Sequence, residues 1–192
     1  MPRLKVGFVL DCESQHVWER WLAENHASAP EVWLRLAKKG SGVSTVSRAE
    51  ALETALCYGW IDGQSSTQDD AHWLQRFTPR TRRSKWSQVN CDAVTALIEA
   101  GRMKPAGFAA VEEARSDGRW DAAYAPPSTI EVPEDLRDTL AQNSTAEEFF
   151  AKLNAQNRYA ILYRIHDAKK PETRARRIEK FVAMLARGET IY

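Results

Sequence analysis

The sequence predicts an α+β protein in which a small sheet with helices occupies the N-terminal part and a helical part follows. Short apolar runs of strand type occur at residues 6–10, 31–37 and 72–78, all before residue 90. Beyond that point, capping residues and prolines separate segments whose apolar residues recur at helical spacing. Hydrophobic residues make up 43% and charged residues 28% of the chain, a balance typical of a folded protein with a core.

The helices of the N-terminal part are predicted from the residues that begin them. Ser14 stands where its hydroxyl can cap a helix over residues 14–25. Ser47 and Glu50 have the spacing of a capping box, which predicts the start of a second helix. The Asp-Gly dipeptide at 62–63 predicts a turn that ends this segment.

Helix boundaries recur through the rest of the chain. Asn90 is a candidate cap for a helix that ends at Gly101, and Pro105 opens another that ends before Gly118. The remaining boundaries are predicted at Pro133, at a second capping box of Ser144 with Glu147, and at a final helix from Pro171 to about Arg187.

A proline-rich segment divides the chain. Residues 125–133 contain three prolines, which cannot sustain a helix, and therefore form the candidate linker. We expect an α+β domain over residues 1–124 and a helical domain over residues 133–192 that packs on it. The second part has a length near the lower limit for independent folding.

Composition narrows the class of protein. The net charge of +1 gives no bulk attraction to nucleic acid or to a membrane surface. Asp11 and Glu13 interrupt the apolar run at the N-terminus, which argues against a signal peptide, and no apolar window is long enough to span a bilayer. The cysteines, Cys12, Cys57 and Cys91, are isolated from one another. The sequence therefore predicts a cytoplasmic protein without membrane insertion, metal site or cofactor.

Four segments together resemble a known family. They are ALCYGWIDG at 55–63, FTPR at 77–80 with SKWSQVN at 84–90, GRWDAAY at 118–124, and AKKPETRARRI at 168–178. Their order and spacing resemble the YdeI/OmpD-associated proteins, also called bacteriocin-protection proteins, over about residues 13–188. The resemblance implies a protective role against peptide toxins and a link to an outer-membrane porin, with no established chemistry. Kinship of the N-terminal part with the YjbR/CyaY-like superfamily implies an antiparallel sheet packed by helices.

The strongest local signal for binding is a basic run at residues 76–85, with five cations and no acid. Arginine suits bidentate capture of phosphate or carboxylate, and Trp73 and Trp86 flank the run as candidate stacking platforms. The alternative is a solvated loop whose arginines pair with the acidic stretch 131–148.

Two further charged residues stand out. Arg174 falls within the apolar arc of the last helix, so we expect its guanidinium to contact a carboxylate or a bound anion, or else to reach water along its stem. Asp62 lies between Trp60 and a glycine, where it is either a base or cation ligand or a turn residue. Asp62 is the best candidate partner for Arg80 or Arg174.

These observations favour a small-anion-binding or stress/bacteriocin-protection protein without catalysis. The expected ligand-binding residues converge on one concave surface, with Arg174 as a further anion holder; they are Trp60, Asp62, Thr78, Arg80, Ser84 and Trp86. One alternative is an enzyme that acts on a small anionic substrate with Asp62 as base. Another is a nucleic-acid-associated module that uses residues 76–86.

Overall fold

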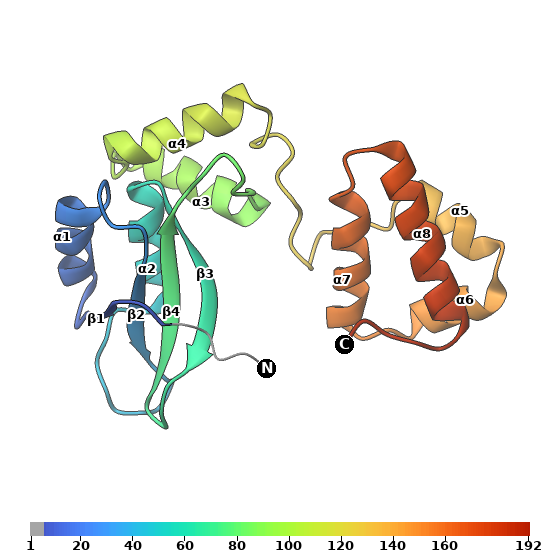
Figure 1. Cartoon of the computed structure of the whole chain (residues 1–192), viewed down its shortest axis with the longest axis horizontal. Coiled ribbons are helices and arrows are strands. Elements are labelled where there is room, and N and C mark those ends of the chain that lie inside the picture. The colour runs from blue at the N-terminus through green and yellow to red at the C-terminus, as the bar shows by residue number, and fades with distance from the viewer. Residues whose placement is uncertain (1–5) are drawn as a thin grey trace. The chain divides into compact units, whose positions relative to one another are not determined.

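The computed structural model describes residues 6–192, which contain four strands and eight helices. They form two compact units. The first comprises residues up to Trp86 together with Asn90–Ala122, and the second comprises Ser87–Val89 with Ala123–Tyr192. Figure 1 shows the sheet in the N-terminal part and helices alone beyond residue 130, so the predicted α+β class is confirmed.

The first unit is built on a four-stranded sheet. Its strands are β1 (Val9–Asp11), β2 (Val32–Ala37), β3 (Trp60–Thr67) and β4 (His72–Pro79). They follow the order β1-β2-β4-β3, in which β1 pairs parallel with β2 and the other two pairings are antiparallel. The sheet is therefore mixed, whereas the family resemblance implied an antiparallel one.

The expected turn at 62–63 is wrong, because Asp62 and Gly63 lie inside β3. The pairing of β3 with β4 shifts between Asp62 and Ser65, which is the signature of a bulge, and a glycine tolerates such an irregularity. The chain instead reverses after β3, where the Asp69 carboxylate accepts the backbone N–H of His72 at 2.7 Å.

Four helices complete this part of the chain. They are α1 (Gln15–Asn25), α2 (Arg48–Cys57), α3 (Gln88–Glu99) and α4 (Pro105–Ser116). The predicted cap at Ser14 and the capping box of Ser47 with Glu50 are both present. Helix α2 packs beside α1, β3 and α4, and the core between α1 and the sheet includes Trp18 and Phe77, whose ring centroids lie 5.5 Å apart.

The second unit is a cluster of four helices: α5 (Glu134–Ala141), α6 (Ser144–Ala151), α7 (Ala155–His166) and α8 (Pro171–Ala186). Its core is aliphatic and aromatic, with Leu136, Ile161, Ile165, Phe181 and Leu185 all buried. The second capping box, expected at Ser144 with Glu147, is absent, because Asn143 is the cap and Ser144 is already helical. Among the described residues, pairing after β4 is limited to one isolated bridge between Ser87 and Tyr124. None of the described helices has the length and apolarity needed to cross a membrane.

Candidate functional site: a basic loop and an arginine–tryptophan cluster

The structure separates the residues expected on one concave surface. Trp60 pairs with Pro79 and Ile61 pairs with Thr78 across β3 and β4. Directly paired residues point to the same face of a sheet and successive residues to opposite faces. Trp60 and Thr78 therefore lie on opposite faces, so the six side chains do not converge.

Trp60 and Asp62 each have a partner elsewhere in the first unit. The Trp60 side chain is 1% exposed, and its indole Nε1–H donates to the carbonyl oxygen of His26 at 3.1 Å. Asp62 accepts from Arg48 Nη2 at 2.7 Å, because Arg48 begins the helix that packs beside β3. The expected pairing of Asp62 with Arg80 or Arg174 is thus wrong.

Arg80 and Trp86 come together directly after β4. The guanidinium carbon of Arg80 lies 3.6 Å from the centroid of the Trp86 ring, which is a close cation–π contact. Arg80 Nη1 donates to the carbonyl oxygen of Lys85 at 3.1 Å, and its backbone N–H donates to Gly59 at 2.9 Å. These contacts hold the arginine in one orientation at the base of the loop.

The Trp86 indole is buried, with 2% of the residue exposed. Its Nε1–H finds no acceptor among the described residues. Trp86 also packs against Trp120, with ring centroids 4.8 Å apart, and the guanidinium carbon of Arg115 lies 5.0 Å from the Trp120 ring. The two indole rings are tilted by 56° to each other, and each has an arginine over it.

The loop itself is an ordered turn. Ser84 donates its backbone N–H to the carbonyl oxygen of Thr81 at 2.9 Å, and the Ser84 hydroxyl accepts the backbone N–H of Thr81 at 2.9 Å. Ser84 is therefore a structural member of this turn. The side chains of Arg82 and Arg83 project from it and are exposed.

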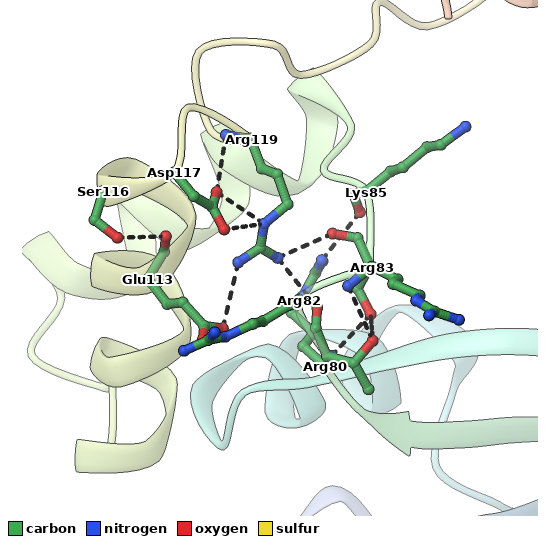
Figure 2. A network of polar contacts seen from close by, with 10 residues as sticks. Arg80, Arg82, Arg83, Lys85, Glu113, Ser116, Asp117 and Arg119 are labelled. Carbon is green, nitrogen blue, oxygen red and sulfur yellow. Dashed lines mark hydrogen bonds and ion pairs between the residues drawn. The ribbon is translucent and has the colours of Figure 1, made fainter.

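Arg119 holds this turn through hydrogen bonds to its backbone, as Figure 2 shows. Its Nη1 donates to the carbonyl oxygens of Thr81 and Ser84 at 3.1 and 3.2 Å. The same guanidinium pairs with Asp117 at 2.8 Å and with Glu113 at 3.3 Å, and its side chain is 13% exposed. Sequence reasoning missed Arg119, although it stands beside Trp120 in the GRWDAAY segment.

Two arginines of the basic run pair with carboxylates of the first unit. Arg82 pairs with Glu113 at 3.0 Å, and Arg76 pairs with Glu31 across the sheet. Neither partner lies in the stretch 131–148. Arg174 belongs to the second unit, where its guanidinium pairs with Asp135.

Comparison with known families divides the chain in two. Residues 10–110 match the family model described as a domain of unknown function, DUF8412, over more than half of the chain. The chain belongs to this family. Residues 129–188 match a second model, described as bacteriocin-protection, YdeI or OmpD-associated. No curated protein and no solved structure matches the chain.

The expected family thus covers less of the chain than the quoted segments suggested. The YdeI or OmpD-associated match is confined to residues 129–188, and kinship of the N-terminal part with the YjbR/CyaY-like superfamily finds no support. Arg80 and Trp86 lie within the DUF8412 region, whereas Arg119 and Trp120 follow it.

The polar side-chain groups of Arg80 and Trp86 can donate hydrogen bonds to a ligand but cannot accept them. They are a guanidinium and an indole N–H, both of which are donors without acceptor capacity. Burial raises the pKa of the neighbouring Cys91 thiol to about 11, even though the charge of Arg80 acts in the opposite direction. That thiol therefore stays protonated at neutral pH. Among the described residues, no group of His, Cys, Asp or Glu side chains could hold a metal ion.

Proposed function

We propose that the chain is a non-catalytic binding protein for a small oxyanion, held by Arg80 and by the indole N–H of Trp86. The supporting observation is the buried Nε1–H of Trp86, which has no acceptor among the described residues. A buried donor without an acceptor costs about 1–3 kcal/mol, so native proteins seldom retain one without a reason. A carboxylate or phosphate oxygen beside the ring edge satisfies this donor.

Arg80 supplies the charge for such a ligand. Its guanidinium carbon lies 3.6 Å from the ring centroid of the same tryptophan, so a positive charge lies beside the indole. Stacking on an aromatic face fixes the plane of a guanidinium, and the planar geometry of its N–H donors matches that of a carboxylate or phosphate. The turn that carries Arg80 is held by Arg119, so little ordering is required on binding.

The same geometry favours a small ion over a polymer. Trp86 is 2% exposed, which leaves no platform for a stacked base. Two cations that a nucleic-acid groove would use, Arg76 and Arg82, already pair with Glu31 and Glu113. The match of residues 129–188 to the bacteriocin-protection model supports a protective setting for this binding in the cell.

The indole N–H resonance of Trp86 tests the proposal. It is assigned by its disappearance in Trp86→Phe, which keeps an aromatic ring under Arg80 but removes the donor. Inorganic phosphate and acetate are titrated at constant ionic strength into the full chain labelled with ¹⁵N. We expect a saturable downfield shift of this resonance, and loss of the binding response in Trp86→Phe and Arg80→Ala.

Arg82→Ala and Arg83→Ala are the matched controls, because both side chains are exposed and Arg82 pairs with Glu113. They should leave the affinity for phosphate or acetate nearly unchanged. The proposal is wrong if neither anion shifts the Trp86 resonance, or if only the two control variants change the shift on titration. Binding of a single-stranded oligonucleotide with a steep salt dependence would point to the polymer alternative instead.

A further inference from the structure

A groove in the second unit runs along helix α7. Its volume is about 580 Å³, which is within the usual range for small-molecule sites. Six of the lining residues follow α7 at a spacing that places them on one stripe of the helix. The lining comprises Pro127, Ala155, Gln156, Tyr159, Ala160, Tyr163, Arg164 and Tyr192.

Aromatic rings form one wall of this groove and their positions are fixed. The ring centroids of Tyr159 and Tyr163 lie 5.9 Å apart, and Tyr163 meets Tyr124 edge-on at 5.1 Å. The Tyr159 hydroxyl donates to the carbonyl oxygen of Ala125 at 3.3 Å. Ala155 and Ala160 carry only methyl groups on the same stripe, so space for a flat ring remains beside the tyrosines.

Tyr192 also lines the groove, and a buried amide holds its backbone in place. The side-chain oxygen of Asn157 accepts the backbone N–H groups of Ile191 and Tyr192, each at 3.0 Å. Asn157 is 2% exposed, whereas Tyr192 is 67% exposed. A rigid buried anchor thus positions an exposed aromatic side chain at the mouth of the groove.

The charged side chain in this lining is a cation. Arg164 is its charged residue, and no acidic side chain belongs to this lining in the described part of the chain. Arg164 Nη1 donates to the carbonyl oxygen of Ala160 at 2.8 Å and Nη2 to the Tyr192 hydroxyl at 3.3 Å. The guanidinium of this lining residue is therefore held between the backbone of α7 and the Tyr192 hydroxyl.

We propose that this groove binds a small aromatic carboxylate. The planar ring lies between the tyrosines and Tyr192 over the two alanines, and the carboxylate meets the guanidinium of Arg164. Offset or edge-on packing of aromatic rings favours a flat ligand, and the arginine fork matches a carboxylate. This groove shares no residue with the arginine–tryptophan cluster of the first unit.

Calorimetric titration of the full chain with 2-naphthoate tests the groove, with 2-naphthamide as the neutral ligand of the same shape. We expect saturable binding of the acid, about tenfold tighter than binding of the amide, because a charge-assisted contact is the stronger one. Arg164→Gln should abolish this preference. Arg158→Gln is the matched control, because Arg158 is on the same helix but stacks on Phe150 at 4.5 Å.

A second variant guards against a folding defect in Arg164→Gln. Ala155→Trp fills the groove from the start of α7 without altering the arginine, and it should block both ligands. The inference fails if the acid and the amide bind equally, if neither saturates in the low millimolar range, or if the preference survives Arg164→Gln. Loss of naphthoate binding in Trp86→Phe alone would assign the ligand to the first unit and also refute it.

Discussion

Arg174 and Asp135 join the first turns of helices α8 and α5 through a two-pronged ion pair. Arg174 Nε and Nη2 donate to the two carboxylate oxygens of Asp135 at 2.5 and 2.9 Å. Arg174 Nη1 also donates to the carbonyl oxygen of Ile165 at 3.0 Å, so one guanidinium links three helices of the second unit. The contact with a carboxylate, expected from the place of Arg174 in the apolar arc, is confirmed.

Removal of Arg174 should destabilise the chain, but by less than loss of a fully buried pair. Breaking a fully buried ion pair by removing one partner costs about 3–5 kcal/mol. The Asp135 side chain is 45% exposed, so solvent screens the pair. We expect Arg174→Ala to cost about 1–2 kcal/mol in urea titration, mainly through the lost charge-assisted hydrogen bonds.

A double-mutant cycle with Asp135→Ala isolates the pair itself. The expected coupling free energy is about 1 kcal/mol, between that of an exposed and a buried pair. Arg176→Ala, on the exposed side of the same helix, should change stability by less than about 0.5 kcal/mol. A coupling indistinguishable from zero would show that Arg174 acts only through its stem and the Ile165 carbonyl.

Asp135 also makes the stability of the second unit depend on acid pH. The hydrogen bond from Arg174, helped by its charge, lowers the pKa of Asp135 below its ordinary value of 3.8. A carboxylate with a lowered pKa in the folded state stabilises the fold above its unfolded pKa, and this contribution is lost as pH falls through the folded value. The advantage of the natural chain over Asp135→Asn should therefore be constant near neutrality and shrink below about pH 4. Urea titrations of both proteins from pH 7 to pH 3 measure it, and an advantage that grows toward low pH would contradict the assignment.

Arg119 is predicted to control the order of the basic loop. Arg119→Ala removes the donors that hold the carbonyl oxygens of Thr81 and Ser84, so the turn should open more often. We expect a loss of about 2 kcal/mol in stability, in line with hydrogen bonds to a charged group. Because the loop contains Arg82 and Arg83, limited trypsin digestion should cut there faster, and mass spectrometry of the fragments locates the cut.

Two variants separate the shape of the Arg119 side chain from its charge. Arg119→Lys keeps the charge but lacks the planar fork, so it should restore only part of the protection. Arg115→Ala removes a neighbouring exposed cation whose main contact is the Trp120 ring, and it should leave the cutting rate near that of the natural chain. Equal protection in Arg119→Ala and in the natural chain would show that the Thr81–Ser84 turn is self-sufficient.

Some features that depend on neighbouring residues were predictable from the sequence, although Asn90, expected as a cap, lies inside α3. The capping box of Ser47 with Glu50 and the start of α4 at Pro105 need only a few adjacent residues, and both are present. The cap of α6 was assigned to Ser144 and not to Asn143, because both residues are good caps, and the expected capping box is absent. Strand β3 was missed because its polar sequence, with an aspartate and a glycine, becomes a strand only by pairing with β4.

In the candidate site, too, a contact between residues close in the sequence was predictable and contacts between distant residues were not. Arg80 and Trp86 are six positions apart, and the structure brings them together as the sequence suggested. Arg119 contacts the same loop although it lies 35 positions after Ser84 in the sequence, and no periodicity or spacing predicts such a contact. The partner of Asp62 was wrong for a related reason, since the docking of α2 beside β3 places Arg48 there.

Gly107 is predicted to be indispensable, although it lies inside helix α4, where alanine is intrinsically favoured by about 1 kcal/mol. A Cβ atom at this position would meet the carbonyl oxygen of Cys57 at 2.2 Å and the Met103 methyl at 2.7 Å. That carbonyl already accepts the backbone N–H of Lys104 at 3.0 Å, so it cannot withdraw without breaking the junction of α2 and α4. The steric cost therefore exceeds the gain in helix propensity, and we expect Gly107→Ala to destabilise the chain by about 3 kcal/mol.

Gly101→Ala provides the contrast, because its cost has a different origin. Gly101 has a φ of 66°, but a Cβ atom there would meet nothing within 4 Å. Only the left-handed backbone conformation opposes the substitution, at about 1 kcal/mol. Urea titration of the two variants should thus rank Gly107→Ala well below Gly101→Ala in stability. The reverse order would mean that α4 can slide away from the end of α2, in which case the close approach of the two helices is not a requirement of this fold.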